Sequence, residues 1–319
     1  MRDLASDLRV SVRRLLAAPG FTALVVLTFA LGIGANTTLF TFFDRAFLRP
    51  LPVAAPDRLV MVHAPGPNMG FITMTKDVPY PLSHPMYEDF RDRGPLLDGV
   101  LGYFTTAIHA TVGSDPERTT ATLVTGTYFP VLGLQPAQGR LLAPADDETP
   151  GGHPVVVLSH DYWQARFGGA ADVVGRTVRV NDTPMTVVGV APAGFRGLDT
   201  DRVPALFVPM AMKKAVTPTW DLLDSRRAMW MTVFARLAPG VTAEQARPGL
   251  NALYGQILQA ELAEIPNPSQ RFRERFLAKT LDLLPGRAGA SGFRDSAGAA
   301  PAGRVAPPPL GVVVALLQP

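Results

Sequence analysis

The chain has 319 residues, enough for one large or two modest domains with a buried core. Apolar residues make up 47%, which excludes a wholly disordered protein, whereas charged residues make up only 18%, below the roughly 25% of an average soluble domain. The net charge of +3 arises from 30 basic and 27 acidic residues, so no nucleic-acid partner is expected. The lack of cysteine excludes disulfides, thiolate metal sites and cysteine nucleophiles.

Residues 1–18 form a predicted amphipathic helix. Leu4, Leu8, Val12 and Leu15 recur at three- and four-residue steps, so they line one face of a helix, and arginines occupy the other faces. The pattern alone fits an ordinary surface helix of a globular protein equally well.

Residues 21–43 form a predicted transmembrane helix. No charged residue occurs between Arg14 and Asp44. The 23 residues of 21–43 exceed the ~20 that cross a hydrocarbon core ~30 Å thick. A signal peptide is the alternative, but its apolar stretch usually has only ~7–15 residues and ends in a small-x-small cleavage motif. The longer run without Ala-x-Ala favours an uncleaved anchor.

Three small or polar residues within this span are candidates for helix packing. Gly32 and Gly34 let a neighbouring backbone approach closely, and the Asn36 amide can bond to a second helix. Four arginines precede the span within 20 residues and three follow it, so the charge count favours an inside N-terminus only slightly.

The residues after the span have the pattern of an α+β region built from many short elements. Strands are expected at 59–62, 97–110, 117–129, 155–159, 205–210, 229–237 and 277–285, with a hairpin at 175–192 that turns at Asp182-Thr183. Helices are expected at 83–94, 127–133, 160–169 and 242–262, with Ser83 and Thr242 as caps. The last three expected elements, the strand at 229–237, the helix at 242–262 and the strand at 277–285, indicate a βαβ-type unit. Together the elements predict two lobes, the middle one inserted into the first.

Residues 285–319 are expected to be a disordered tail. They contain 20 alanines, glycines or prolines without periodicity, and the apolar stretch at 310–317 is far too short to span a membrane.

The motifs of common enzymes are missing from the sequence. It contains no phosphate-binding GxxxxGK[ST] loop, GxSxG elbow, HExxH helix or EF-hand loop, so we expect no enzyme, cofactor or metal site. His153 and His160 could share a metal only with help from Asp146, Asp147 or Glu148. A solvated turn is the simpler interpretation of that acidic group.

The sequence resembles one known family over roughly residues 1–294. ABC transporter permeases of the MacB/FtsX type, most of all the large duplicated orphan permeases, have a first transmembrane segment similar to the run PGFTALVVLTFALGIGANTTLFTFFDRAFLRPLP, which PDRLV follows. Their MacB-like extracytoplasmic core domain is similar to VVVLSHDYWQARFGG, GRTVRVNDTPMTVVGVAPAGFRG and MWMTVFARLAPGVTAEQA.

The resemblance implies a permease subunit without an active site. It implies a cytoplasmic helix 1–18, an anchor in the inner membrane, and a periplasmic core domain over 44–284. That domain would have a porter-like lobe (45–145 and 225–284) and an inserted β-rich lobe (146–224). The implied partners are a separate cytoplasmic ABC ATPase, an extracytoplasmic protein, the lipid bilayer and a second copy of the chain. The implied function is to couple the ATPase to movement of the outer domain in efflux or mechanotransmission.

The sequence departs from the family after Arg294. Family members have several spans, whereas here only PLGVVVALL resembles the start of a second one. We therefore expect a truncated or frameshifted product, with residues 285–319 as the remnant. The alternative is a complete single-pass ligand-binding protein or hydrolase, whose only candidate site lies near residues 146–161.

Overall fold

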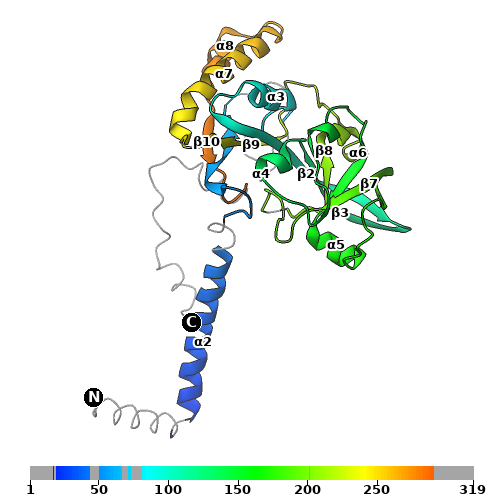
Figure 1. Ribbon diagram of the computed structural model, residues 1–319. Helices are drawn as coiled ribbons and strands as arrows, with labels where there is room; N and C mark the ends of the chain where they lie inside the picture. Colours follow the sequence, from blue (N-terminus) through cyan, green and yellow to red (C-terminus); the bar gives the residue numbers. More distant parts are fainter. Residues whose placement is uncertain are drawn as a thin grey trace. The chain divides into compact units, whose positions relative to one another are not determined.

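The computed structural model describes residues 17, 19–43, 50–66, 71–72, 81–200 and 202–290. The chain divides into two compact units, Met1–Arg49 and Pro50–Pro319 (Figure 1). Apart from Ala17, the predicted helix over 1–18 lies outside the described residues, as does the tail beyond Ala290.

The described part of the first unit is the helix α2 (Pro19–Phe43). It corresponds to the predicted span at 21–43 and begins two residues earlier. Proline is tolerated in the first turn of a helix because its missing N–H would have no partner there. Pro19 is therefore compatible with the first turn of α2.

The second unit is an α+β domain around one ten-stranded sheet (Figure 1). The strands are β1 (Leu59–His63), β2 (Leu97–Val112), β3 (Asp115–Val124), β4 (Gln138–Gly139), β5 (Val155–Leu158), β6 (Thr177–Val180), β7 (Thr183–Val190), β8 (Leu206–Pro209), β9 (Thr232–Leu237) and β10 (Asp282–Pro285). The α-helices are α3 (His84–Arg93), α4 (Tyr128–Leu132), α5 (His160–Phe167), α6 (Lys213–Val216), α7 (Ala243–Ala263) and α8 (Gln270–Leu277). Short 3₁₀ turns are η2 (Pro56–Arg58), η3 (Pro144–Asp146) and η4 (Met210–Met212).

The sheet begins with two interleaved βαβ units. Its strand order is β10-β1-β9-β2-β3-β8-β5-β7-β4, and β6 pairs with β2 and β7. Because β9 is antiparallel to both β1 and β2, those two strands are parallel, and α3 connects them. Likewise β1 separates the parallel strands β9 and β10, which α7 and α8 connect. The predicted βαβ-type unit is therefore one half of a split βαβ pair.

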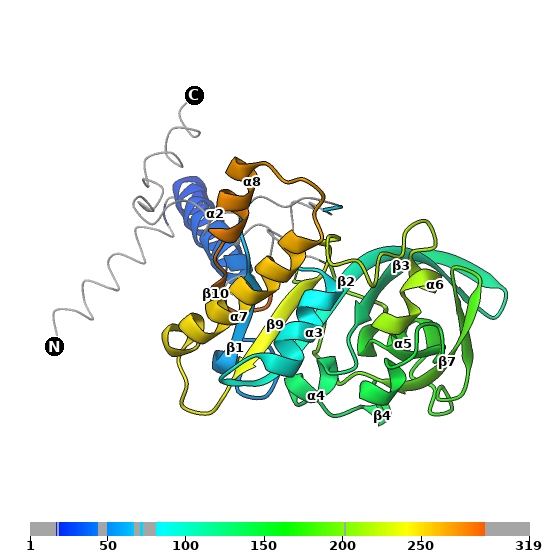
Figure 2. The ribbon, with the colours of Figure 1, turned by 90° about the horizontal axis from the view of Figure 1, so that it is seen from above.

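Both faces of the central strands are buried. In β1, Val60 and Val62 belong to the core under α3 and α7, whereas Leu59 and Met61 belong to the core around α4. Figure 2 shows α3 and α7 side by side over β9 and β1. A strand covered on both sides reads as a continuous apolar run, which explains the sequence LVMV.

The predicted helix caps are confirmed. The Ser83 hydroxyl accepts a hydrogen bond from the Met86 N–H, and Thr242 and Gln245 form a reciprocal capping box at the start of α7. Gly168 ends α5 in the left-handed conformation that glycine adopts without steric cost.

Four details differ from the sequence prediction. The hairpin between β6 and β7 turns at Asn181-Asp182, both with positive φ, because asparagine and aspartate tolerate the left-handed region better than Thr183 would. The expected strand at 277–285 is only β10, since Leu277 ends α8 and residues 278–281 form neither helix nor strand. The first residues of the expected tail, 285–290, are ordered by backbone bonds described below. Finally, β4 lies in the segment assigned to the porter-like lobe but pairs with β7 of the inserted segment.

The predicted lobes share one sheet. β3 from the flanking segment pairs in parallel with β8 from the inserted segment, and β2 pairs with β6. The lobe boundaries at 145/146 and 224/225 remain a prediction.

Candidate functional site

The first functional element is α2, which has the length and surface of a membrane span. Residues Pro19–Thr38 have a mean hydropathy of 1.6 and none of this stretch is buried. Seven large apolar side chains are 59–77% exposed: Phe21, Leu24, Val26, Leu27, Phe29, Leu31 and Ile33. Thr28 and Thr38 return their hydroxyls to the backbone carbonyls of Leu24 and Gly34, both at 2.8 Å. These two hydroxyls are thereby satisfied inside the helix, as a bilayer requires.

The candidate packing residues do not all share one face of α2. Gly32 and Asn36 are four residues apart and therefore adjacent on the helix surface, whereas Gly34 lies on a different side. Asn36 is exposed, and a side chain at Gly32 or Gly34 would meet nothing within 4 Å. Their role in packing stays a prediction.

The second functional element is the entry segment, which lies between Pro50, the first residue of the second unit, and β1. The Ala54 N–H donates to Leu132 O at 3.0 Å. The buried Arg236 of β9 binds the residues next to this contact on both sides, because its Nη1 donates to Ala55 O at 3.0 Å and its Nε to Val131 O at 2.7 Å. Arg236 therefore fastens the entry segment to β9 and to α4.

The exit segment, residues 286–290, lies beside the entry segment. The Leu51 N–H donates to Arg287 O and the Gly286 N–H to Leu59 O, both at 2.8 Å. An ion pair between Arg287 and Asp57 at 3.3 Å adds to these bonds. The two ends of the domain are thus joined along the edge formed by β1 and β10.

The exit segment also binds the loop between β7 and β8. Ala290 donates its N–H to Leu198 O at 2.8 Å and accepts one from Thr200 at 3.0 Å. Gly289 has φ 76°, and a Cβ at this position would collide with the Leu198 carbonyl oxygen. Ala290 and Leu198 belong to the same buried core as α4. This loop therefore links the inserted segment directly to the exit.

A buried lysine lies between two tryptophans. The Lys213 Nζ is 3.2 Å from the ring centroid of Trp220 and 4.6 Å from that of Trp230, and it donates to Thr217 Oγ1 at 2.8 Å. Burial lowers the pKa of Lys213 to about 7, against a smaller raising effect of Asp221. This cluster was not predicted; the sequence indicates only that a lysine directly follows the apolar run LFVPMAM.

A second buried titratable group is Glu261, on the buried side of α7. Burial raises the pKa of Glu261 to about 7, and Arg226 and Lys279 only partly oppose it. Its Oε1 and the Tyr254 hydroxyl have no hydrogen-bond partner among the described residues. Burial also lowers the pKa of Lys279 to about 8. Such groups occur in functional sites, but within the described ranges they belong to no cluster of three histidine or carboxylate groups that could hold a metal.

The two aspartates of the alternative site near 146–161 make contacts within the fold. Both Asp146 oxygens accept hydrogen bonds from Arg140, at 2.6 and 2.8 Å. Asp147 accepts the N–H groups of Gly126 and Ala211, which ties two loops together. In the part of the chain that the structure describes, no three histidine or carboxylate groups lie close enough to hold a metal. The two aspartates hold loops in place.

Comparison with known proteins identifies a family for this arrangement. The sequence model described as "MacB-like periplasmic core domain" matches residues 22–253, which include most of α2 and well over half of the chain. No curated protein matches the sequence significantly.

Solved structures of the same kind are similar to the chain. They include the periplasmic region of MacB from Actinobacillus actinomycetemcomitans, which is 16% identical, with a TM-score of 0.49 over 77% of this chain and 94% of that one. A permease domain from Porphyromonas gingivalis is 14% identical, with a TM-score of 0.46 over 73% and 92%. The extracellular domain of the ABC-type transporter YknZ from Gram-positive bacteria is also 14% identical, with a TM-score of 0.45 over 62% and 94%.

Proposed function

Because the chain belongs to the family of the MacB-like periplasmic core domain, we propose that it is a membrane-anchored permease subunit of a MacB/FtsX-type ABC transporter. In this proposal α2 crosses the inner membrane, residues 1–18 lie in the cytoplasm, and the second unit lies outside. A separate cytoplasmic ATPase supplies the energy. The observation that carries the proposal is an uncharged helix, with no buried residue over Pro19–Thr38, that precedes a domain of this family in the chain.

The backbone contacts at the two ends of the domain support a mechanical role. Entry and exit segments are bonded to each other and to the strands β1 and β9, so a displacement of either end would act on the sheet itself. The bond between Ala290 and Leu198 would carry the same displacement to the inserted segment. In efflux or mechanotransmission, the outer domain would move in this way with the ATPase cycle.

Two further partners follow from the proposal. Gly32 and Asn36 form one face of α2, which would pack against another membrane helix, either of a second copy or of another subunit. The outer domain would bind an extracytoplasmic protein.

Purification from membranes tests the proposal. The full chain is tagged and expressed in the organism that encodes it. It is then cross-linked in intact cells and extracted in mild detergent. We expect a P-loop ATPase to co-purify, and we expect a variant without residues 2–18 to lose it while it stays in the membrane. Recovery of the cross-linked chain without any ATP-hydrolysing partner would contradict the coupling.

A further inference from the structure

The helix α8 has a strongly basic surface. Its sequence QRFRERFL places Arg271, Arg273 and Arg275 at alternate positions, and all three are exposed. The rings of Phe272 and Phe276 stack at 5.3 Å, and Phe276 is buried in the core. The phenylalanines therefore hold the helix in place while the arginines extend from it.

These arginines lack the ion pairs that most other described arginines of the domain make. Eleven arginines lie within 4 Å of a carboxylate oxygen: Arg58, Arg91, Arg93, Arg140, Arg166, Arg176, Arg179, Arg196, Arg226, Arg247 and Arg287. Within the described residues, none of the three on α8 has such a partner. The one acid of the helix, Glu274, accepts a hydrogen bond from Gln270 instead, at 2.9 Å.

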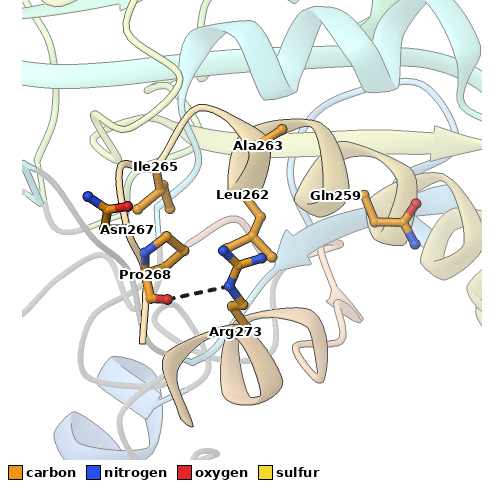
Figure 3. Close-up of a pocket in the computed structure, with 7 residues that line it drawn as sticks. All are labelled: Gln259, Leu262, Ala263, Ile265, Asn267, Pro268 and Arg273. Carbon is orange, nitrogen blue, oxygen red and sulfur yellow. Dashed lines mark hydrogen bonds between the residues drawn. The ribbon is translucent and has the colours of Figure 1, made fainter. Parts of the chain in front are cut away.

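The arginines line two hollows on different sides of α8. Arg271 and Arg275 are four residues apart and line one hollow of about 340 Å³ together with Ser269 and Phe272. Arg273 lines the other, of about 370 Å³, together with Leu262, Ile265, Asn267 and Pro268 (Figure 3). Its Nε donates to Pro268 O at 3.4 Å, which directs the guanidinium toward the end of α7.

We propose that α8 is the docking surface for an acidic segment of a partner protein. A guanidinium presents a planar pair of donors that matches a carboxylate, so each hollow can receive an aspartate or glutamate side chain. A lipid surface fits less well, because a flat layer of headgroups cannot enter hollows on two sides of one helix. The inference deepens the proposed function, since it gives the chemistry of the extracytoplasmic partner.

Binding of a labelled polyglutamate peptide to the full chain in detergent micelles tests the proposal, with fluorescence anisotropy as the signal. We expect R271A/R275A to weaken binding about five- to tenfold, which is the effect expected from the loss of two exposed ion pairs. R271K/R275K should lose less, because the charge stays while the paired donors are lost. Binding should also weaken between about 50 and about 300 mM salt, because screening reduces surface attraction.

The matched control is R118A/K214A, which also removes two positive charges from exposed positions outside α8. It should change the affinity less than twofold. An equal loss in the control, or no peptide binding by the wild type, would overturn the proposal. So would binding of monomeric short-chain phosphatidylglycerol in place of the peptide, lost in R271A/R275A, because it would assign the surface to lipid. A negative result leaves the ATPase co-purification unaffected, so the two proposals can fail separately.

Discussion

At the scale of single residues, Lys213 gives the second unit a specific pH dependence. Its pKa is about 7 in the folded chain, below the value of about 10.5 expected for the unfolded chain. Between these values the unfolded chain binds a proton that the folded chain does not. Stability should therefore rise with pH across this window, and fall as the pH drops toward 7.

The variant K213M removes this effect. Relative to K213M, the free energy of unfolding of the wild type should increase by about 2 kcal/mol from pH 7.5 to 9.5. Urea unfolding of the full chain in detergent micelles measures it, because all three tryptophans lie in the second unit. Lys214 is exposed, so K214M serves as the control and should follow the wild type. Parallel pH curves for wild type and K213M would contradict the burial of a neutral lysine.

Glu261 should show the opposite dependence. Its folded pKa of about 7 lies above the value of about 4.5 in the unfolded chain, so between these values the folded chain holds the extra proton. Stability should fall as pH rises, by about 2 kcal/mol between pH 5 and 7 relative to E261Q. The same urea titration measures this difference. The exposed Glu264 gives the control E264Q, and a wild-type slope that matches E261Q would show that Glu261 stays ionised.

Single residues were the least predictable level from sequence. A lysine after LFVPMAM carries no signal of the tryptophans that enclose it, because Trp220 and Trp230 reach it through loop geometry. The Arg236 contacts to Ala55 and Val131 join positions about a hundred or more residues apart. By contrast, Ser83 and Thr242 were predictable because a cap acts on residues only three positions away.

At the scale of elements, Gly289 holds the exit segment against the loop after β7. Gly289 and Gly240 have the same φ of 76°, but only at Gly289 would a Cβ collide with a neighbouring carbonyl oxygen. G240A should therefore cost about 1 kcal/mol of backbone strain, and G289A about 2–4 kcal/mol.

Hydrogen exchange separates a local from a global effect. In G289A the amides of Thr200 and Ala290 should exchange much faster, because both bond across this contact, while the amides of β1 and β9 stay protected. In G240A the same two amides should exchange as in the wild type. Unchanged protection in G289A would mean that the exit segment does not depend on this glycine.

Elements with a strong local pattern were predicted well. α2 is a long uncharged run, α3, α5 and α7 have side-chain caps, and β1 is a short apolar run. α8 was missed because half of its eight residues are charged and its only apolar residues are Phe272, Phe276 and Leu277. The order of the strands depends on contacts between distant segments, such as β3 with β8, which a local pattern does not encode.

At the scale of the whole molecule, the central claim is that α2 anchors the chain and that the second unit lies outside the cytoplasm. The uncharged span and the family of the outer domain were both recognisable from sequence. The charge count beside the span could not fix its direction, because four arginines precede the span and three follow it.

Single cysteines test this claim most directly, because the natural chain has none and gives no background labelling. S114C lies in the exposed turn between β2 and β3, and S6C precedes the span. In intact spheroplasts, a membrane-impermeant maleimide should label S114C fully and S6C only after the membrane is permeabilised. Labelling of S6C but not S114C before permeabilisation, or recovery of the chain in the soluble fraction, would contradict the account.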